Sequence, residues 1–362
     1  MRRVLAVLAV AGGCLAVAPV ADGEHDAYRA AVSYWAMRAD FFDRPSGLYR
    51  ERTGKAPIAR AWPYSQALAA TLAMADVPSR GRLYGRDVDR SVRALGRYAD
   101  RTGVYRAVAG ATGDVYYDDN EWIALELLRW YGRRHVRWAL ARAERVFAVV
   151  RSAWDTNRAH PCPGGVFWTT ARRNEDRNAV TTATGALLAM RLYEATRHEH
   201  YVRWARRMLD WLDTCLSGPD GLLWDHVGLD GTVDAARWSY NQGTAIGAHV
   251  LLYELTNDAQ SLRRAVDLAN ASLAYFNPAP TGSEPPFFLA IFFRNLLELE
   301  RVTHDQRYGA AVAEYADAAW AGVRDPSSGL FRFHRGRERL LEQAAMVQIY
   351  AMLAAQTVTT GA

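Results

Sequence analysis

The sequence contains almost no lysine. Lys55 is the only one, so 43 of the 44 basic residues are arginine. The arginines are interspersed with acidic residues, and no run of five or more like charges occurs. A nucleic-acid-binding domain usually gathers its basic residues in one patch or stripe. The net charge of +5 is therefore no sign of such binding, and we expect no nucleic-acid partner.

Cysteine is also scarce, with three in 362 residues. Outside the N-terminal segment only Cys162 and Cys215 remain, and they either form a disulfide or stay unpaired in the core. Their spacing fits no metal site, and no aspartate-rich loop has the spacing of an EF-hand. Neither a phosphate-binding glycine loop nor an H-E-x-x-H motif is present. We therefore expect no metal and no cofactor.

Residues 1–21 have the layout of a secretory signal, with two arginines, an apolar stretch and then small residues. Gly12 and Gly13 interrupt the apolar run and polar sequence follows it, which favours cleavage over an uncleaved anchor. A lipoprotein signal at Cys14 is a further alternative. We expect the mature chain, 22–362, to be monomeric, secreted or associated with the cell envelope, and not stably inserted in a membrane.

No segment alternates convincingly with period two, so we expect little β-structure outside the loops. Helical patterns instead recur in pairs. Each pair has an apolar helix rich in small residues, a short turn and a charged amphipathic helix. A helix that is apolar all round is buried, whereas one with a charged face lies at the surface.

The buried-type helices are expected to begin near Trp62, Asp118, Asn178, Trp238, Pro286 and Leu340, and the surface-type helices near Asp26, Val88, Arg134, His200, Ser261 and Asp305. Six of each in alternation predict one all-α domain, an (α/α)6 barrel of six inner and six outer helices. An open solenoid is the alternative, but it should end in a polar cap. The last segment here is a buried-type helix.

The connections fall into two classes. Turns within a pair are short, whereas the connections from an outer helix to the next inner helix are long and rich in Gly, Trp and Asp, as in 154–177 and 217–237. Long loops gathered at one end of a rigid scaffold commonly carry the functional site. We expect the site at that end.

Two adjacent aspartates, Asp118 and Asp119, begin the second inner helix in the segment YYDDNEWIALELL. One interpretation is a capping box, in which Asp118 caps the helix and Glu121 reaches back. The other is catalytic, because retaining glycosidases use two carboxyls about 5 to 5.5 Å apart and neighbouring side chains are able to flank one bond. Burial and mutual repulsion would have to offset the helix dipole and keep one carboxyl protonated.

Other inner-helix starts carry aromatic and amide side chains that suit a sugar. These are Trp168, Asn178, Trp238, Tyr240, Asn241 and Gln242. Rings with a polar edge stack on sugar faces, and amides bind hydroxyls. Helix capping explains the asparagines equally well, and core packing explains the tryptophans.

These segments resemble glycoside hydrolase family 76, whose known members are endo-α-1,6-mannanases and related fungal wall proteins. YYDDNEW is similar to the family's tyrosine-led double-aspartate motif, GGVFW to its Gly-Gly-Trp loop, WSYNQG to its W-[ST]-Y-N-Q-G segment and FFLAIFFRNL to its F-x-x-I-F-x-R stretch. The resemblance covers the chain after residue 21, and the family's (α/α)6 fold agrees with the helix count.

The resemblance implies a retaining mechanism with Asp118 as nucleophile and Asp119 as acid/base. We also expect Tyr117, Asn120, Trp122 and Asp225 to bind substrate. Two positions depart from the family pattern: Ile123 replaces a common second Trp, and His226 stands where Gly is frequent. Both affect the expected subsites more than the reaction.

The expected function is therefore hydrolysis of α-1,6-mannosidic linkages in mannan or another mannose-containing glycan. One alternative is a non-hydrolytic glycan-binding or transglycosylating cell-wall protein. Another is a different (α/α)6 sugar enzyme, such as an unsaturated glucuronyl hydrolase or an epimerase. An epimerase relies on histidines at the inner-helix ends, where this sequence has Asp and Asn.

Overall fold

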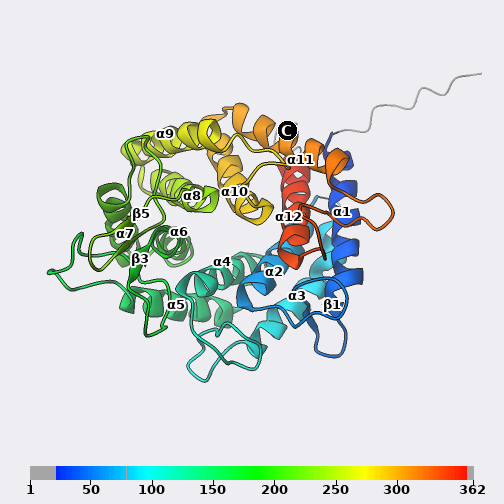
Figure 1. The fold of residues 1–362 in the computed structure, drawn as a ribbon, viewed down its shortest axis with the longest axis horizontal. Helices are drawn as coiled ribbons and strands as arrows, with labels where there is room; N and C mark the ends of the chain where they lie inside the picture. Colours follow the sequence, from blue (N-terminus) through cyan, green and yellow to red (C-terminus); the bar gives the residue numbers. More distant parts are fainter. Residues whose placement is uncertain (1–21, 79, 357–362) are drawn as a thin grey trace, which may run out of the picture.

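A computed structural model describes residues 22–78 and 80–356, and within these ranges twelve α-helices form two concentric rings (Figure 1). The inner helices are α2 (Ala61–Asp76), α4 (Tyr117–Arg134), α6 (Ala179–Thr196), α8 (Ser239–Thr256), α10 (Pro286–Thr303) and α12 (Leu340–Gln356). The outer helices are α1 (Asp22–Phe41), α3 (Gly85–Ala94), α5 (Arg137–Ser152), α7 (His200–Cys215), α9 (Ala259–Phe276) and α11 (Arg307–Gly322). Two 3₁₀ turns, Gly81–Tyr84 and Leu95–Arg97, flank α3.

The inner ring is closed. Each inner helix contacts the next one along the chain, and α12 contacts α2, so that the last inner helix meets the first (Figure 1). The predicted (α/α)6 barrel is confirmed, and the open solenoid is wrong. The expected signal segment, 1–21, lies outside the described residues. No helix in 22–78 or 80–356 is both long and apolar enough to span a membrane.

Small residues allow the inner helices to approach closely. In α8, a Cβ atom built on Gly243 would lie 2.6 Å from the Cα atom of Phe292, and one on Gly247 would lie 1.9 Å from the side-chain oxygen of Asn295. Glycine is the residue without a Cβ atom, so it lets the α8 and α10 backbones come together. This contact explains the small-residue pattern seen in the sequence.

The two ends of the barrel differ in their connections. Four inner helices, α4, α6, α8 and α10, pass to the next outer helix through segments of two or three residues at 135–136, 197–199, 257–258 and 304–306. Each of these segments begins with a residue in the left-handed conformation, which closes the helix by a backbone hydrogen bond. These residues are His135, Arg197, Asn257 and His304. At the opposite end, loops such as 153–178 and 216–238 lead into the inner helices.

Polar side chains near the start of four inner helices hold the preceding long loops in place. Each belongs to the fourth residue of its helix and hydrogen-bonds a backbone group of the loop at 2.8–3.1 Å. The pairs are Asn120 with Tyr105, Thr182 with Val166, Gln242 with Leu223, and Gln343 with Phe331. A buried backbone amide is costly unless it has such a partner.

The loops also contain short strands, which the sequence did not reveal. Strand β1 (Phe42–Asp43) pairs with β2 (Leu48–Tyr49), and β3 (Asp176–Asn178), β4 (His226–Gly228) and β5 (Val233–Asp234) form an antiparallel sheet in that order. Strands of two or three residues are too short to give an alternating pattern. A disulfide between Cys162 and Cys215 joins the 153–178 loop to the end of α7.

Candidate active site

A cavity of about 650 Å³ opens at the end of the barrel that carries the long loops. Its walls come from the starts of α2, α4, α6, α8 and α10 and from the loops that precede them. The lining residues are Arg60, Trp62, Pro63, Ala107, Tyr116, Asp118, Asp119, Trp122, Trp168, Asp176, Asn178, Val180, Asp225, His226, Trp238, Tyr240, Pro285, Phe287 and Phe288. Acids, aromatic rings and one amide therefore meet in one pocket.

Asp118 and Asp119 lie in the first turn of α4 and do not cap it. The residue before the helix is Tyr116, whose side chain makes no capping hydrogen bond. Glu121 does not reach back, because it is fully buried and neither of its carboxyl oxygens has a hydrogen-bond partner within 22–78 and 80–356. The capping-box interpretation is wrong, and both aspartates line the pocket.

The two aspartates experience different surroundings. Burial raises the pKa of Asp118 to about 6, and the charge of Asp225 adds to the rise, whereas hydrogen bonds from the Trp168 indole and the helix amides oppose it. Burial also raises the pKa of Asp119 well above its usual value, and the neighbouring Asp118 charge raises it further. Arg60 acts on Asp119 in the opposite direction. Of the two, Asp118 therefore ionises more readily and Asp119 holds its proton more tightly.

Aromatic rings surround the acid pair. Trp168 is 39% exposed and packs edge-on against Tyr116, with ring centroids 5.1 Å apart. Across the pocket, Tyr240 stacks on Phe288 at 4.0 Å, and Trp238 contacts the same ring edge-on at 5.6 Å. Such faces provide apolar surface for the carbon side of a sugar ring.

The sheet β3–β4–β5 supplies a polar wall. The register pairs Asn178 with His226 and His226 with Asp234, which places these side chains on one face. Asp176 is two residues before Asn178 and accepts a hydrogen bond from its amide at 3.2 Å. On the other face, Arg177 is fully buried and donates to the Asp155 carboxylate at 3.0 Å. The polar and structural roles therefore alternate along β3.

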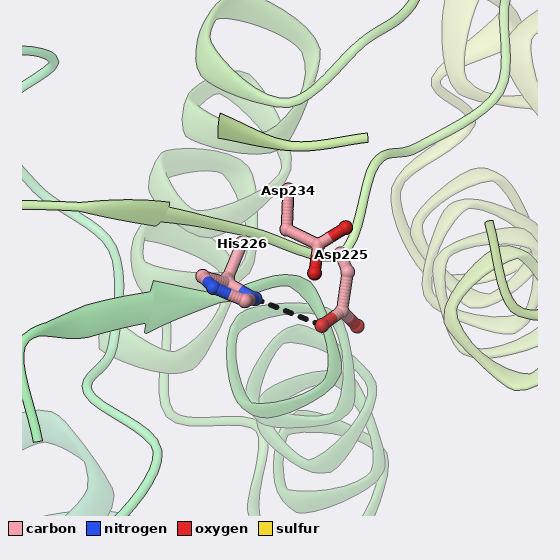
Figure 2. A group of neighbouring side chains, drawn as sticks. All are labelled: Asp225, His226 and Asp234. Carbon is pink, nitrogen blue, oxygen red and sulfur yellow. Dashed lines mark hydrogen bonds and ion pairs between the residues drawn. The ribbon is translucent and has the colours of Figure 1, made fainter. Parts of the chain in front are cut away.

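One cluster in the described residues has the composition of a metal site. The imidazole of His226 and the carboxylates of Asp225 and Asp234 bring their ligand atoms within 4.8 Å of one another (Figure 2). However, the Nδ1 atom of His226 lies 2.9 Å from the Oδ2 atom of Asp225, which is a hydrogen bond between the two side chains. We therefore treat this cluster as a hydrogen-bonded pair with a third carboxylate nearby.

Most of the residues expected at the site line the cavity. They are Asp118, Asp119, Trp122, Trp168, Asn178, Asp225, Trp238 and Tyr240. Asn178 also caps α6 by accepting the Val180 amide at 3.2 Å. Asn178 therefore both caps α6 and lines the cavity.

Four expected residues are absent from the cavity lining: Tyr117, Asn120, Asn241 and Gln242. Asn120 and Gln242 hold the backbones of Tyr105 and Leu223, so their amides are used within the protein. Asn241 is fully buried behind Asp225 and donates to its carboxylate at 3.4 Å.

Tyr117 packs against the core instead of lining the cavity. The ring of Tyr116, which precedes the helix, takes the place expected for it. For an amide or a tyrosine at a helix start, the sequence does not distinguish a side chain that faces a ligand from one that faces its own loop.

Several lining residues were missed by sequence reasoning. Arg60 directly precedes α2, and Trp62 is the second residue of that helix. Phe287 and Phe288 lie in the apolar start of α10, so the sequence suggests that they are core residues. Asp176 lies on a strand too short to recognise, and His226, noted in the sequence only as a departure from the family pattern, lies on another. The signal that was available is position, because each missed residue stands next to the start of an inner helix or on a long loop.

Several known structures with this fold are glycoside hydrolases of family 76. The glycoside hydrolase family 76 mannosidase Bt3792 of Bacteroides thetaiotaomicron VPI-5482 superposes with a TM-score of 0.84 at 24% identity, covering 93% of this chain and all of that one. The α-1,6-mannanase GH76A of Salegentibacter sp. HEL1_6, solved as an inactive variant with α-1,6-mannotriose, gives a TM-score of 0.78 at 20% identity, over 91% and 99% of the chains. At these identities the likeness establishes the fold.

Sequence relatives agree with the structural ones. The mannan endo-1,6-alpha-mannosidase DCW1 of Saccharomyces cerevisiae is 29% identical over 144 residues, which are 37% of this chain and 31% of that protein. The alignments with the yeast relatives therefore span about a third of their length. The model of glycosyl hydrolase family 76 matches residues 28–356, nearly the whole described chain. The chain belongs to glycosyl hydrolase family 76.

Proposed function

We propose that this protein is a retaining glycoside hydrolase that cleaves α-1,6-mannosidic linkages in mannan or mannose-containing glycans. The observation that carries the proposal is the buried pair Asp118 and Asp119, whose pKa values are raised to different extents inside an aromatic pocket. Two carboxyls with different protonation states are what a double displacement needs. Relatives described as mannan endo-1,6-alpha-mannosidases supply the substrate class.

In the first step, the ionised Asp118 attacks the anomeric carbon and forms a glycosyl ester as the bond to the leaving oxygen breaks. The Trp168 indole and the amides at the start of α4 favour the anion by hydrogen bonding. The helix N-terminus favours a negative charge at the same place. These groups hold the nucleophile ionised and oriented.

Asp119 donates its proton to the departing glycosidic oxygen in that step. It then takes a proton from the water that attacks the ester, which releases the sugar and regenerates Asp118. Asp119 is therefore the acid/base residue. Because the reaction needs Asp118 ionised and Asp119 protonated, kcat/KM should rise as the pH passes about 6 and fall again at higher pH.

The pocket binds the sugar by stacking and by hydrogen bonds. Trp168 and Trp238 offer ring faces from two successive long loops, and Asp225 and Asn178 offer polar groups to hydroxyls. The inactive Salegentibacter mannanase, in which two consecutive aspartates are replaced by asparagine, is in complex with α-1,6-mannotriose. That complex supports the assignment of Asp118 and Asp119 to bond cleavage and of the surrounding residues to binding.

We further propose that the chain is exported. The disulfide between Cys162 and Cys215 is typical of proteins from oxidising compartments. It agrees with the signal expected in 1–21, and with an enzyme whose glycan substrate lies outside the cell.

The test is incubation of the purified protein with linear α-1,6-mannan, followed by measurement of the released oligosaccharides. Asp118→Asn and Asp119→Asn should each lower the rate by about 10²- to 10⁴-fold or more while the helical circular dichroism is retained. Azide should partly restore turnover to an Asp118 variant shortened to Ala, with inversion at the anomeric carbon.

The control is Glu126→Gln, a carboxyl-to-amide change on the same helix outside the cavity. Its folded fraction should keep kcat within about threefold of wild type. Near-normal activity of both aspartate variants would show that the catalytic assignment is wrong. A wild type that binds mannan but releases nothing would favour the glycan-binding alternative.

A further inference from the structure

Asp225 is fixed on all sides by its surroundings. Its backbone amide donates to the Asp234 carbonyl at 3.1 Å, and its carbonyl accepts the Ala179 amide, at the start of α6, at 2.7 Å. Its carboxylate is held at both oxygens, since His226 lies 2.9 Å from Oδ2 and the Asn241 amide lies 3.4 Å from Oδ1. Both oxygens of this cavity-lining carboxylate are therefore already hydrogen-bonded within the protein.

His226 is itself held in place by β4, the central strand of its sheet. It pairs with Asn178 on β3 and with Asp234 on β5, and Figure 2 shows its ring directed toward Asp225. A carboxylate only accepts hydrogen bonds, so Nδ1 carries the proton in this pair. Asp234 stands on the neighbouring strand and makes no hydrogen bond to the Asp225 side chain among the described contacts.

We propose that His226 is a positioning residue for Asp225, holding its carboxylate in the orientation in which it accepts hydrogen bonds from the sugar hydroxyls. The inference rests on the proposed function, which makes Asp225 a substrate-binding residue. Asn241 makes only the longer of the two hydrogen bonds to Asp225. The orientation of the Asp225 carboxylate therefore depends mainly on His226.

The expected effect is on substrate binding more than on turnover. A hydrogen bond to a charged group that is fixed in advance costs no reorganisation when the sugar arrives. Without His226, Asp225 has to be ordered by the substrate, so kcat/KM should fall about 10- to 100-fold. Because Asp225 is not a reacting group, most of that change should appear in KM.

The experiment compares His226→Ala with His226→Asn on a linear α-1,6-manno-oligosaccharide. The Asn amide nitrogen is two bonds from Cβ, as Nδ1 is, so Asn retains the donor while Ala removes it. We expect His226→Ala to show the full loss and His226→Asn to stay within about threefold of wild type.

A matched control is available outside the cavity. The Nδ1 atom of His160 lies 2.9 Å from the Oδ2 atom of Asp155, the same distance as in the His226 pair. His160→Ala should leave kcat/KM unchanged. If removing any histidine–aspartate hydrogen bond had a general effect, both His160→Ala and His226→Ala would lower kcat/KM.

A double-mutant cycle with Asp225→Ala separates positioning from direct contact. If His226 acts through Asp225, adding His226→Ala to Asp225→Ala should cause no further loss of kcat/KM. Additive losses would overturn the inference, and so would equal losses in His226→Asn and His226→Ala. A loss reproduced by EDTA in the wild type would overturn it in favour of a bound cation.

The outcomes also distinguish this inference from the proposed function. A wild type inactive on the oligosaccharide would contradict the proposed function and this inference together. An active wild type whose His226→Ala variant keeps its kcat/KM would contradict this inference alone.

Discussion

Helix α4 buries carboxyl groups at both ends of the barrel, in different surroundings. Toward the short turns, Glu126 is buried and accepts hydrogen bonds from Arg129 at 2.6 Å and from Arg294 at 2.7 Å. At the end with the long loops, the Oδ1 atom of Asp118 and both carboxyl oxygens of Glu121 are buried without a hydrogen-bond partner among the described residues. One helix thus carries paired and unpaired acids about two turns apart.

The two environments are separated by an apolar layer. Trp122, Val180 and Ile291 pack together between the cavity that holds the aspartates and a second hollow of about 540 Å³ at the other end. The second hollow is lined by arginines that pair with glutamates, among them Arg191 with Glu298. The layer keeps those cations away from the aspartates.

Burial affects the acids at the two ends of α4 differently. A buried carboxylate with a cation stays ionised and serves structure, whereas one without a cation is driven toward its protonated form. Burial raises the pKa of Glu121 well above its usual value, with the charge of Asp118 adding to the rise. Unpaired buried acids cost stability, and such costs are found at functional sites.

The largest effect on stability should come from removing the charge of Glu126, the buried carboxylate that is paired with arginines. Glu126→Gln leaves the partly exposed Arg294 without the buried carboxylate that pairs with it, so the free energy of unfolding should fall by about 3 kcal/mol. Urea denaturation measures this loss, and activity per folded molecule should change little. A stability near that of the wild type would mean that Gln348, which accepts from Arg294 at 2.7 Å, is a sufficient partner.

A gain in stability is expected instead when Asp118, at the other end of the barrel, is replaced. The folded-state pKa of Asp118 is raised to about 6, so the native state holds this proton more tightly than the unfolded chain. Ionisation therefore costs stability as the pH rises from about 4 through about 6. Asp118→Asn removes the cost and should be more stable than wild type at pH 7, by up to about 3 kcal/mol.

That gain should shrink as the pH is lowered toward 4, where the wild-type carboxyl is protonated as well. Thermal denaturation of both proteins from pH 4 to pH 7 measures the difference. A difference that does not change with pH would contradict the raised pKa. An Asp118→Asn protein less stable than wild type at pH 7 would mean that the anion is stabilised by its hydrogen bonds more than burial disfavours it.

The smallest effect should come from a polar residue that only holds a loop. Gln242→Leu removes the side chain that donates to the Leu223 carbonyl and accepts its amide, both at 2.9 Å. Leaving those buried groups unpaired should cost about 1–3 kcal/mol. KM for a manno-oligosaccharide should remain within about threefold of wild type at a temperature where the variant is folded. A large rise in KM without loss of stability would mean that Gln242 contacts the substrate.

Much of this molecule was predictable from its sequence. The six apolar helices alternating with six amphipathic ones predicted the closed double ring, because burial on every face leaves a helix no polar side to expose. The long loops correctly located the cavity end. The sequence also marked the aspartate pair, since Asp119 had no role in a cap.

The roles of single polar residues were not predictable in the same way. Asn120 and Asn178 both stand at inner-helix starts, yet one holds the Tyr105 backbone and the other lines the cavity. Tyr116 and Tyr117 are adjacent, and the structure places the first in the cavity lining and the second against the core. A shift of one residue at a helix start turns a side chain by about 100°, from 3.6 residues per turn.

The class of the fold, the end with the cavity and the adjacent acids were evident from the sequence alone, because they depend on periodicity and residue type within one segment. The fold was needed to show which polar groups face the cavity, how Cys162 and Cys215 pair, and that His226 meets Asp225 beside α6. Protonation and orientation depend on the groups that surround a side chain, and those groups come from helices and loops far apart in the chain.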